Sequence, residues 1–213
     1  RNPTMSDAPP SNFTPAPMDS SKRTWLITSS CVGAAGAAAL ATPFVTSFAP
    51  SERAKAAGAA VEVDIAGLKP GEKLTVEWRG KPVWIMRRTP EQMAALKGID
   101  GQLADPGSER TAFPTPEYAR NEARARAEHP ELLVVVGICT HLGCSPVDKF
   151  QTGAQPSLPD DWKGGFFCPC HGSTFDLSGR VFKNKPAPDN LEVPPYVYLS
   201  DSKLLIGEDK KQA

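Results

Sequence analysis

Two short segments hold most of the metal-ligating side chains of this chain. The chain has 5 Cys and 3 His in 213 residues, yet four of the Cys and two of the His lie in GICTHLGCSPV (137–147) and FFCPCHGSTFD (166–176). We call these segments box one and box two; their candidate ligands are Cys139, His141 and Cys144 in box one and Cys168, Cys170 and His171 in box two. Thiolates and imidazoles presented together from two short loops predict a metal centre shared by both boxes.

The residues allow two kinds of centre. A zinc site of the Cys₂His₂ type would take one Cys and one His from each box, but it accounts poorly for the two Cys left over. A [2Fe–2S] centre would be complete if one iron took two Cys and the other took two His; its ligands would then be Cys139, Cys168, His141 and His171. A zinc-binding interaction module would be colourless and redox-silent, so absorption and electron paramagnetic resonance spectra distinguish the two hypotheses.

The N-terminal residues 1–20 are polar and rich in Pro. Such a segment cannot bury enough apolar surface to offset its ordering entropy, so we expect a disordered tail. Met5 and Met18 are candidate translation starts. Over the whole chain, 24 basic residues balance 24 acidic residues, which argues against nucleic acid as a partner.

Residues 21–48 are predicted to form a membrane anchor. The segment contains 24 consecutive residues without a charge, which as a helix would extend about 36 Å and cross a hydrocarbon core of roughly 30 Å. The alternative is a cleaved signal peptide, since AKA at 54–56 resembles its cleavage pattern, but such peptides have apolar regions of only about 7–15 residues. The sequence SKRTWL (21–26) is similar to a twin-arginine export signal with Lys22 in place of the first arginine.

The pattern of β-forming residues predicts an antiparallel β domain over residues 61–213. Residues 49–60, which are small, polar and rich in Ala, are expected to be a hinge linker between the anchor and this domain. The predicted strands, separated by tight turns, lie in VEVDI, KLTVEW, PVWIMR, ELLVVVGI, GGFFCPC, STFDLSGRVF and YVYLSDSKLLIGE. The expected fold class is therefore all-β, with one N-terminal transmembrane helix.

Two helical segments are expected to interrupt the strands. Thr89 as the cap, Pro90 at the first position and Gln92 at the third predict a short helix that ends near Lys97. Residues 115–130, TPEYARNEARARAEHP, begin in the same way and alternate charged residues with Ala until a proline ends the pattern. This pattern predicts a small helical insertion before box one.

The motifs CTHLGC and CPCHGS resemble the two boxes of Rieske iron–sulfur proteins. The anchor, linker, insertion and segment 185–196 (KPAPDNLEVPPY) are similar to those of the bacterial subunit found in ubiquinol–cytochrome c reductase, so the resemblance covers nearly the whole chain after residue 20. It implies one Rieske-type [2Fe–2S] cluster held by the four ligands named above, and a disulfide between Cys144 and Cys170. A structural disulfide indicates an oxidising compartment.

The resemblance also implies how the cluster is tuned. Two neutral imidazoles replace two anionic thiolates, and Rieske potentials accordingly lie at about −150 to +300 mV, against about −400 mV for plant-type ferredoxins. Ser173 is similar to the family serine that donates to a bridging sulfide. Phe175 stands where high-potential members have a tyrosine that donates to a ligand sulfur. We therefore expect a potential below that of the tyrosine-containing relatives.

The function implied by the resemblance is electron transfer from ubiquinol to a c-type cytochrome, with proton release on the periplasmic side of the bacterial inner membrane. The exposed His171, together with His141, would be the catalytic contact with the quinol, and Leu142 and the loop 186–188 would surround the cluster and dock. The implied partners are cytochrome b and c-type cytochrome subunits in a dimeric complex, with membrane lipid around the single-pass anchor. His129 is expected to be an ordinary surface residue.

Three other Rieske classes are less compatible with the sequence. An aromatic-ring dioxygenase needs a further iron site with two His and one carboxylate, and only His129 remains outside the boxes. The Rieske small subunit of a periplasmic oxidase such as arsenite oxidase shares the boxes and export signals, but is less expected to have the insertion and a retained anchor. The insertion also favours the ubiquinol type over the plastoquinol-oxidising counterpart of photosynthetic membranes.

Overall fold

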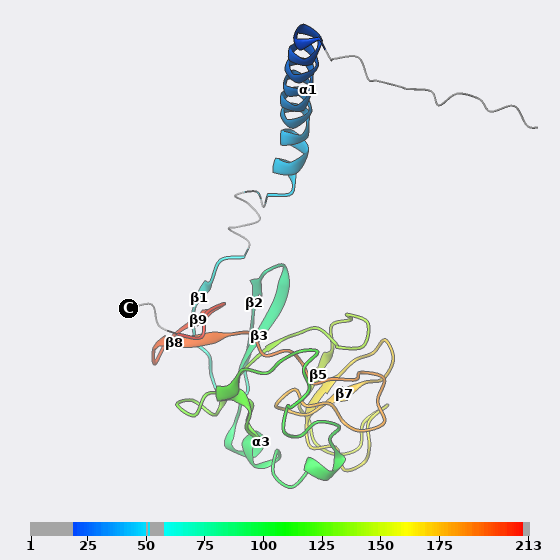
Figure 1. The fold of residues 1–213 in the computed structure, drawn as a ribbon. Helices are drawn as coiled ribbons and strands as arrows, with labels where there is room; N and C mark the ends of the chain where they lie inside the picture. Colours follow the sequence, from blue (N-terminus) through cyan, green and yellow to red (C-terminus); the bar gives the residue numbers. More distant parts are fainter. Residues whose placement is uncertain (1–18, 50, 52–57, 211–213) are drawn as a thin grey trace, which may run out of the picture. The chain divides into compact units, whose positions relative to one another are not determined.

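The computed structural model describes residues 19–49, 51 and 58–210. The chain divides into two compact units, Arg1–Ser51 and Glu52–Ala213, and Figure 1 shows a long helix in the first and the strands in the second. The predicted tail and both candidate starts lie outside the described residues, apart from the last two residues of the tail. Most of the predicted linker, including the AKA segment, lies outside them as well.

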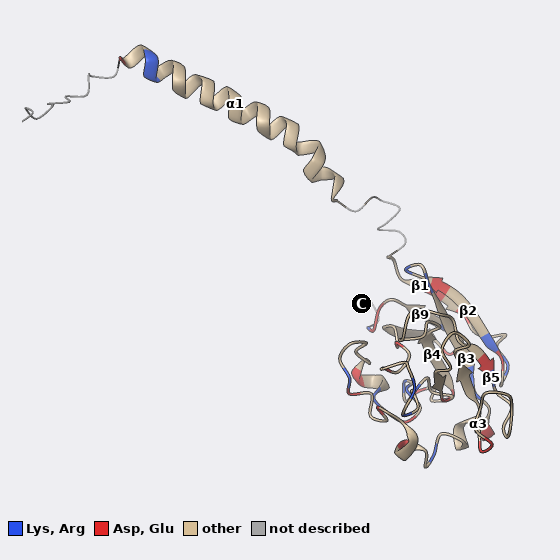
Figure 2. Ribbon diagram, turned by 90° about the vertical axis from the view of Figure 1, so that its right-hand side faces the viewer, with Lys and Arg blue, Asp and Glu red and all other residues tan. Residues whose placement is uncertain are grey.

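The first unit contains helix α1, Ser20–Ser47. Asp19 caps it by accepting a hydrogen bond from the Ser21 N–H over 3.1 Å. Its 28 residues correspond to about 42 Å of helix, longer than a hydrocarbon core of roughly 30 Å. Figure 2 shows basic residues only near its N-terminal end, where Lys22 and Arg23 lie. By length and composition, α1 is a candidate membrane span.

The second unit is built from antiparallel strands, as the sequence predicts, and they form three sheets. The first sheet has the order β1 (Val61–Asp64), β9 (Lys203–Ile206), β8 (Tyr196–Ser200). The second has the order β2 (Lys73–Trp78), β3 (Lys81–Arg87), β4 (Leu132–Val136). The third has the order β5 (Val147–Lys149), β6 (Gly165–Phe167), β7 (Thr174–Phe175).

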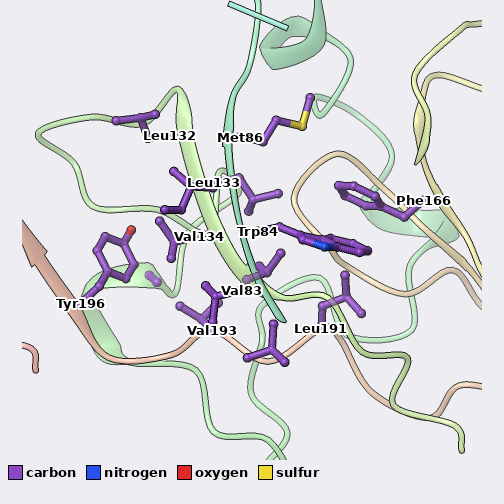
Figure 3. Close-up of a cluster of buried hydrophobic side chains, with 14 of the residues drawn as sticks. Val83, Trp84, Met86, Leu132, Leu133, Val134, Phe166, Leu191, Val193 and Tyr196 are labelled. Carbon is purple, nitrogen blue, oxygen red and sulfur yellow. The ribbon is translucent and has the colours of Figure 1, made fainter. Parts of the chain in front are cut away.

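The hydrophobic core lies around strands β3 and β4, whose apolar residues are almost all buried. Figure 3 shows side chains of these strands packed together with residues that come from later in the chain; those labelled are Val83, Trp84, Met86, Leu132, Leu133, Val134, Phe166, Leu191, Val193 and Tyr196. Trp84 of β3 stacks on Phe166 of β6, with ring centroids 5.0 Å apart. This stack joins the second sheet to the third, which carries box two.

The short helix predicted after Thr89 is confirmed. Helix α3, Pro90–Ala94, has Pro at its first position and a capping box in which Thr89 and Gln92 each bond the other's backbone N–H. It ends a few residues before Lys97. The following residues form turns, and Gly98 has a φ of 75°, which no helix residue adopts.

The helix predicted over residues 115–130 is wrong. The segment contains only one 3₁₀ turn, Glu117–Ala119, followed by bends and turns. Arg124 has a φ of 47°, which is incompatible with a right-handed helix. Its guanidinium is fully buried, and the guanidinium of Arg126 lies 3.7 Å from the Tyr118 ring centroid. Arg124 donates to the carbonyls of Ser178, Gly179 and Leu191, and these long-range bonds replace the local hydrogen bonds that the alternation of charge and Ala had indicated.

Candidate metal centre

The two boxes occupy equivalent positions in the fold. Box one joins β4 to β5, and box two extends from β6 into β7. In box one, the Cys139 N–H donates to the Cys144 carbonyl over 2.7 Å and the Gly143 N–H donates to the Cys139 carbonyl over 3.0 Å. In box two, Cys168 donates to the Ser173 carbonyl over 2.8 Å and Gly172 donates to the Cys168 carbonyl over 2.9 Å. The same two-bond turn therefore forms twice.

Each turn depends on a glycine at the same position. Gly143 and Gly172 have φ values of 84° and 77°, a region that favours glycine. Both lie four residues after the first Cys of their box. The paired turns explain glycines that the spacing of the Cys and His residues left without a role.

The structure brings the four predicted ligands together in two pairs. Cys139 and Cys168 are 2 % and 1 % exposed and have free thiols. The rings of His141 and His171 lie edge to face, with centroids 4.7 Å apart. His171 is exposed and His141 is half-buried. The sulfur donors are thus buried, and one of the two imidazoles reaches the solvent.

The surroundings of Cys139 act on its thiol in opposite directions. Burial raises the pKa of the Cys139 thiol, and the neighbouring Cys168 raises it further. The backbone N–H of His141 and the hydroxyl of Ser173 lower it, because both hydrogen-bond the sulfur and favour the thiolate. Burial is the largest cause, so the net pKa of the Cys139 thiol is raised, and the thiol must lose its proton before it can bind a metal.

The donor set satisfies the requirements of a [2Fe–2S] centre with two Cys and two His ligands. The His141 Nδ1 atom is buried and has no hydrogen-bond partner among the described residues. A buried polar atom without a partner is costly, and iron would supply that partner. The two thiols and two rings therefore offer the donor types that a mixed sulfur and nitrogen site requires.

Cys144 and Cys170 form a disulfide, as the resemblance implied. The bond joins the tips of the two boxes, and the Cα atoms of its two Cys are 6.6 Å apart. It removes both sulfurs from the set of metal ligands. Among the described residues the remaining free Cys are Cys31, Cys139 and Cys168, and Cys31 lies in α1.

A third loop is hydrogen-bonded to both boxes. We call residues 185–189 (KPAPD) the Pro loop. The Thr140 hydroxyl of box one donates to the Asp189 carbonyl over 2.6 Å. The Ala187 N–H donates to the Ser173 hydroxyl of box two over 2.9 Å. Pro186 and Pro188 are exposed, and Leu142 at the tip of box one is 72 % exposed.

The remaining predicted residues lie as follows. Ser173 and Phe175 are both fully buried, and Phe175 pairs with Phe166 across β7 and β6. His129 lies outside the site but is not a simple surface residue, because its Nδ1 is 3.3 Å from a Glu131 carboxylate oxygen. Its ring packs edge to face on Tyr198, with centroids 4.6 Å apart.

The sequence did not predict that Trp84 packs against both boxes. Gly137 and Phe166 each lie two residues before the first Cys of a box. Trp84 contacts both: it stacks on Phe166, and a Cβ added at Gly137 would lie 2.2 Å from its ring. The only signal of this contact in the sequence was Gly137, which directly follows the buried strand β4. A glycine at such a position indicates that another group packs closely against the backbone.

Replacing Gly137 with alanine is expected to destabilise the domain by about 3 kcal/mol, the upper part of the usual range for overpacking. The added methyl group overlaps the Trp84 ring, which cannot move without breaking its stack on Phe166. Urea denaturation of the purified protein measures the loss. Gly67→Ala is the matched control, since a Cβ there meets nothing within 4 Å. Equal stability of the two variants would contradict the prediction.

Comparisons with known proteins match this chain as follows. A family model described as "Rieske [2Fe-2S] domain" matches residues 120–196. The chain is 54% identical over 192 residues to the "Ubiquinol-cytochrome c reductase iron-sulfur subunit" of Allochromatium vinosum, covering 90% of each chain. It is 41% identical over 182 residues to the protein of the same name from Bradyrhizobium diazoefficiens, covering 85% of this chain and 90% of the relative. A solved chain titled "Hyperthermophilic respiratory Complex III" is 26% identical with a TM-score of 0.42, covering 84% of this chain and 97% of that one.

Proposed function

This chain belongs to the family of Rieske iron–sulfur subunits of ubiquinol–cytochrome c reductase, and we propose that it carries electrons from ubiquinol to a c-type cytochrome in that enzyme. Its cofactor is a Rieske-type [2Fe–2S] cluster. The structural observation that supports the proposal is the meeting of both boxes at one site, with their thiols buried and an imidazole exposed.

We assign the cluster to four side chains. The buried thiols of Cys139 and Cys168 would bind one iron, and the rings of His141 and His171 would bind the other. The bound cluster supplies one-electron redox chemistry at a potential that the two neutral imidazoles raise. The disulfide between Cys144 and Cys170 holds the tips of the two loops together, so that the ligand pairs keep their relative positions.

The exposed imidazole gives the site a contact for protons as well. The ring of His171 is exposed, so its outer nitrogen is available to form a hydrogen bond with a quinol hydroxyl and to hold the proton that leaves the quinol. His141 lies beside it and is the second candidate. The exposed apolar residues Leu142, Pro186 and Pro188 surround this contact and would exclude water when they dock on a partner.

We further propose how the chain is placed in the complex. Helix α1 would cross the inner membrane once as an anchor in contact with lipid, with residues 49–60 as a hinge. The β domain would then lie on the periplasmic side, where a disulfide persists. Cytochrome b would complete the quinol pocket, because one exposed contact cannot enclose a quinol by itself. A c-type cytochrome would receive the electron, and the whole complex would be dimeric.

Purification from membranes in detergent tests this proposal. We expect haem b and haem c to copurify with the chain, and electron paramagnetic resonance to show a Rieske signal that ubiquinol reduces. Added cytochrome c should then oxidise the reduced protein within the complex. Stoichiometric zinc without acid-labile sulfide would contradict the cofactor, whereas an intact cluster without the haem subunits would contradict the proposed partners.

Phe175→Tyr is expected to raise the reduction potential of the cluster. The new hydroxyl would add a hydrogen-bond donor near the ligand sulfurs, and such donors stabilise the reduced, more negative state. A redox titration followed by electron paramagnetic resonance measures the change. Phe113→Tyr, at a half-buried position before the 3₁₀ turn, is the control and should leave the potential unchanged. A potential that does not rise in Phe175→Tyr would contradict the prediction.

A further inference from the structure

Three sulfur atoms lie close together at the site, and only two of them are joined. The Sγ atoms of Cys144, Cys168 and Cys170 all lie within 4.8 Å of one another. Cys144 and Cys170 form the disulfide, whereas Cys168 has a free thiol. One free thiol is therefore held beside a disulfide, which is the arrangement that thiol–disulfide exchange requires.

The three sulfurs differ in their access to solvent. Cys168 is 1 % exposed, while Cys144 is half-buried and Cys170 is exposed. Exchange is faster when the sulfur that leaves is a stabilised thiolate, and water stabilises a thiolate better than a protein interior does. Attack by Cys168 on the Cys144 sulfur releases the exposed Cys170, whereas attack on the Cys170 sulfur releases the half-buried Cys144. The structure thus favours Cys144 as the sulfur that is attacked.

Burial of Cys168 does not prevent this reaction. It shields the thiol from reagents in solution, but the disulfide is already within 4.8 Å of its sulfur. A nucleophile held next to its target reacts as though the target were highly concentrated. In the ligand set proposed above, iron would occupy the Cys168 sulfur and make it unavailable for attack. The cluster is therefore the group that separates this thiol from the disulfide chemically.

We propose that in the cluster-free protein the Cys168 sulfur attacks the Cys144 sulfur and exchanges the disulfide, so that a bound cluster protects the native pairing. A bond forms between the sulfurs of Cys168 and Cys144, and the bond between Cys144 and Cys170 breaks. The bonding electron pair leaves with the Cys170 sulfur, which takes up the proton that Cys168 lost. One disulfide and one thiol are present before and after, so no oxidant is needed.

The exchange has a consequence for assembly, which rests on the proposed ligand set. Once its sulfur is in a disulfide, Cys168 is lost as a ligand and the site cannot hold iron through two Cys and two His. A chain whose disulfide forms before the cluster is inserted would therefore lose its capacity for the cluster. Insertion of the cluster must precede oxidation of the tip cysteines.

Cys139→Ser and Cys168→Ser test the proposal, because each lacks one of the two thiolate ligands and should be purified without a cluster. Each variant keeps a single unpaired thiol in the β domain, besides Cys31 of α1. Alkylation followed by peptide mass spectrometry locates that thiol. In Cys139→Ser we expect alkylation to move from Cys168 to Cys170. In Cys168→Ser, the matched control, Cys170 should stay in its disulfide with Cys144 and remain unmodified.

An unmodified Cys170 in Cys139→Ser would overturn the proposal. Alkylation of Cys170 in Cys168→Ser would overturn it as well, because the exchange would then not need the Cys168 sulfur. If Cys139→Ser does not fold, the unmodified protein is stripped of iron with a chelator under anaerobic conditions, and alkylation is followed over time. Cys170 should become reactive after iron is removed, and a Cys170 that stays unmodified would overturn the proposal.

Refilling the stripped protein with ferrous iron and sulfide tests the consequence for assembly. The fraction that regains the Rieske signal should fall as Cys170 becomes reactive, and full recovery after complete exchange would overturn the protective role of the cluster. Absence of the Rieske signal from the unmodified protein before iron is removed would instead contradict the proposed function. The two failures are therefore distinguishable.

Discussion

Replacing Cys139 with serine is expected to abolish the [2Fe–2S] cluster and all quinol oxidation. Cys139 is 2 % exposed and has a free thiol. A serine oxygen is a poor ligand for iron–sulfur clusters, which take thiolates at these positions, and no other free thiol of box one is available because Cys144 is in the disulfide. We expect no Rieske signal and no acid-labile sulfide in the purified variant.

Cys31→Ser is the matched control for this loss. Cys31 is the free cysteine of α1 among the described residues and is exposed there, so its removal should leave cluster content and potential unchanged. A protein that keeps a normal signal after Cys139→Ser would contradict the ligand assignment. Loss of the signal in Cys31→Ser would show that the anchor takes part in cluster assembly, which the two-box site does not require.

Replacing Arg124 with methionine is expected to lower the free energy of unfolding by about 3–5 kcal/mol. This is the usual effect when a buried charged group is removed and its hydrogen-bond acceptors are left without a donor. Its guanidinium donates to the carbonyls of Ser178, Gly179 and Leu191 and to the Thr115 hydroxyl, at 2.7–3.3 Å. Methionine has a similar length and meets the same strain at positive φ, so the loss reports on the charged group and its hydrogen bonds and not on the backbone. Urea denaturation followed by circular dichroism measures it.

The charge of Arg124 is retained at neutral pH despite its burial. Desolvation lowers the pKa of this guanidinium to about 10, and the carboxylate of Asp176 opposes the shift. The methionine variant therefore removes a real buried cation along with its hydrogen bonds. Arg120→Met is the control in the same segment: Arg120 is exposed and donates one bond, to the Thr115 carbonyl, so its loss should cost less than about 1 kcal/mol. Equal losses would contradict the role of Arg124.

Most of the strands and the box positions were predictable because their signals are local, whereas the short strand β5, Val147–Lys149, was not predicted. Alternating β-formers and a fully buried run such as ELLVVV indicate strands wherever they are placed, and sheets of the expected type formed from them. The capping residues Thr89 and Gln92 act within one turn, so α3 formed where they predicted it. The disulfide between Cys144 and Cys170 was predicted from the resemblance of the two boxes to those of Rieske proteins, and the structure contains it.

The helix predicted over 115–130 shows where local signals fail. Alternation of charge and Ala indicates an exposed helix, but it does not show which hydrogen-bond acceptors an arginine side chain can reach in the folded domain. Arg124 gains bonds to carbonyls 54 to 67 residues away in sequence, and these outweigh a helix propensity of a few tenths of a kcal/mol per residue. The segment is therefore not helical beyond one 3₁₀ turn, and the Arg124 side chain is buried in the core.

The sequence by itself determined the donor types and the strands that lead into the boxes, β4 and β6, because each depends on residues close together in the chain. Only the tertiary structure decided that Trp84 lies under both boxes, that Arg124 is buried and that the Ala187 N–H meets the Ser173 hydroxyl. Those contacts join residues far apart in sequence. Their free energy comes from packing and desolvation in the assembled core, which no short stretch of sequence contains.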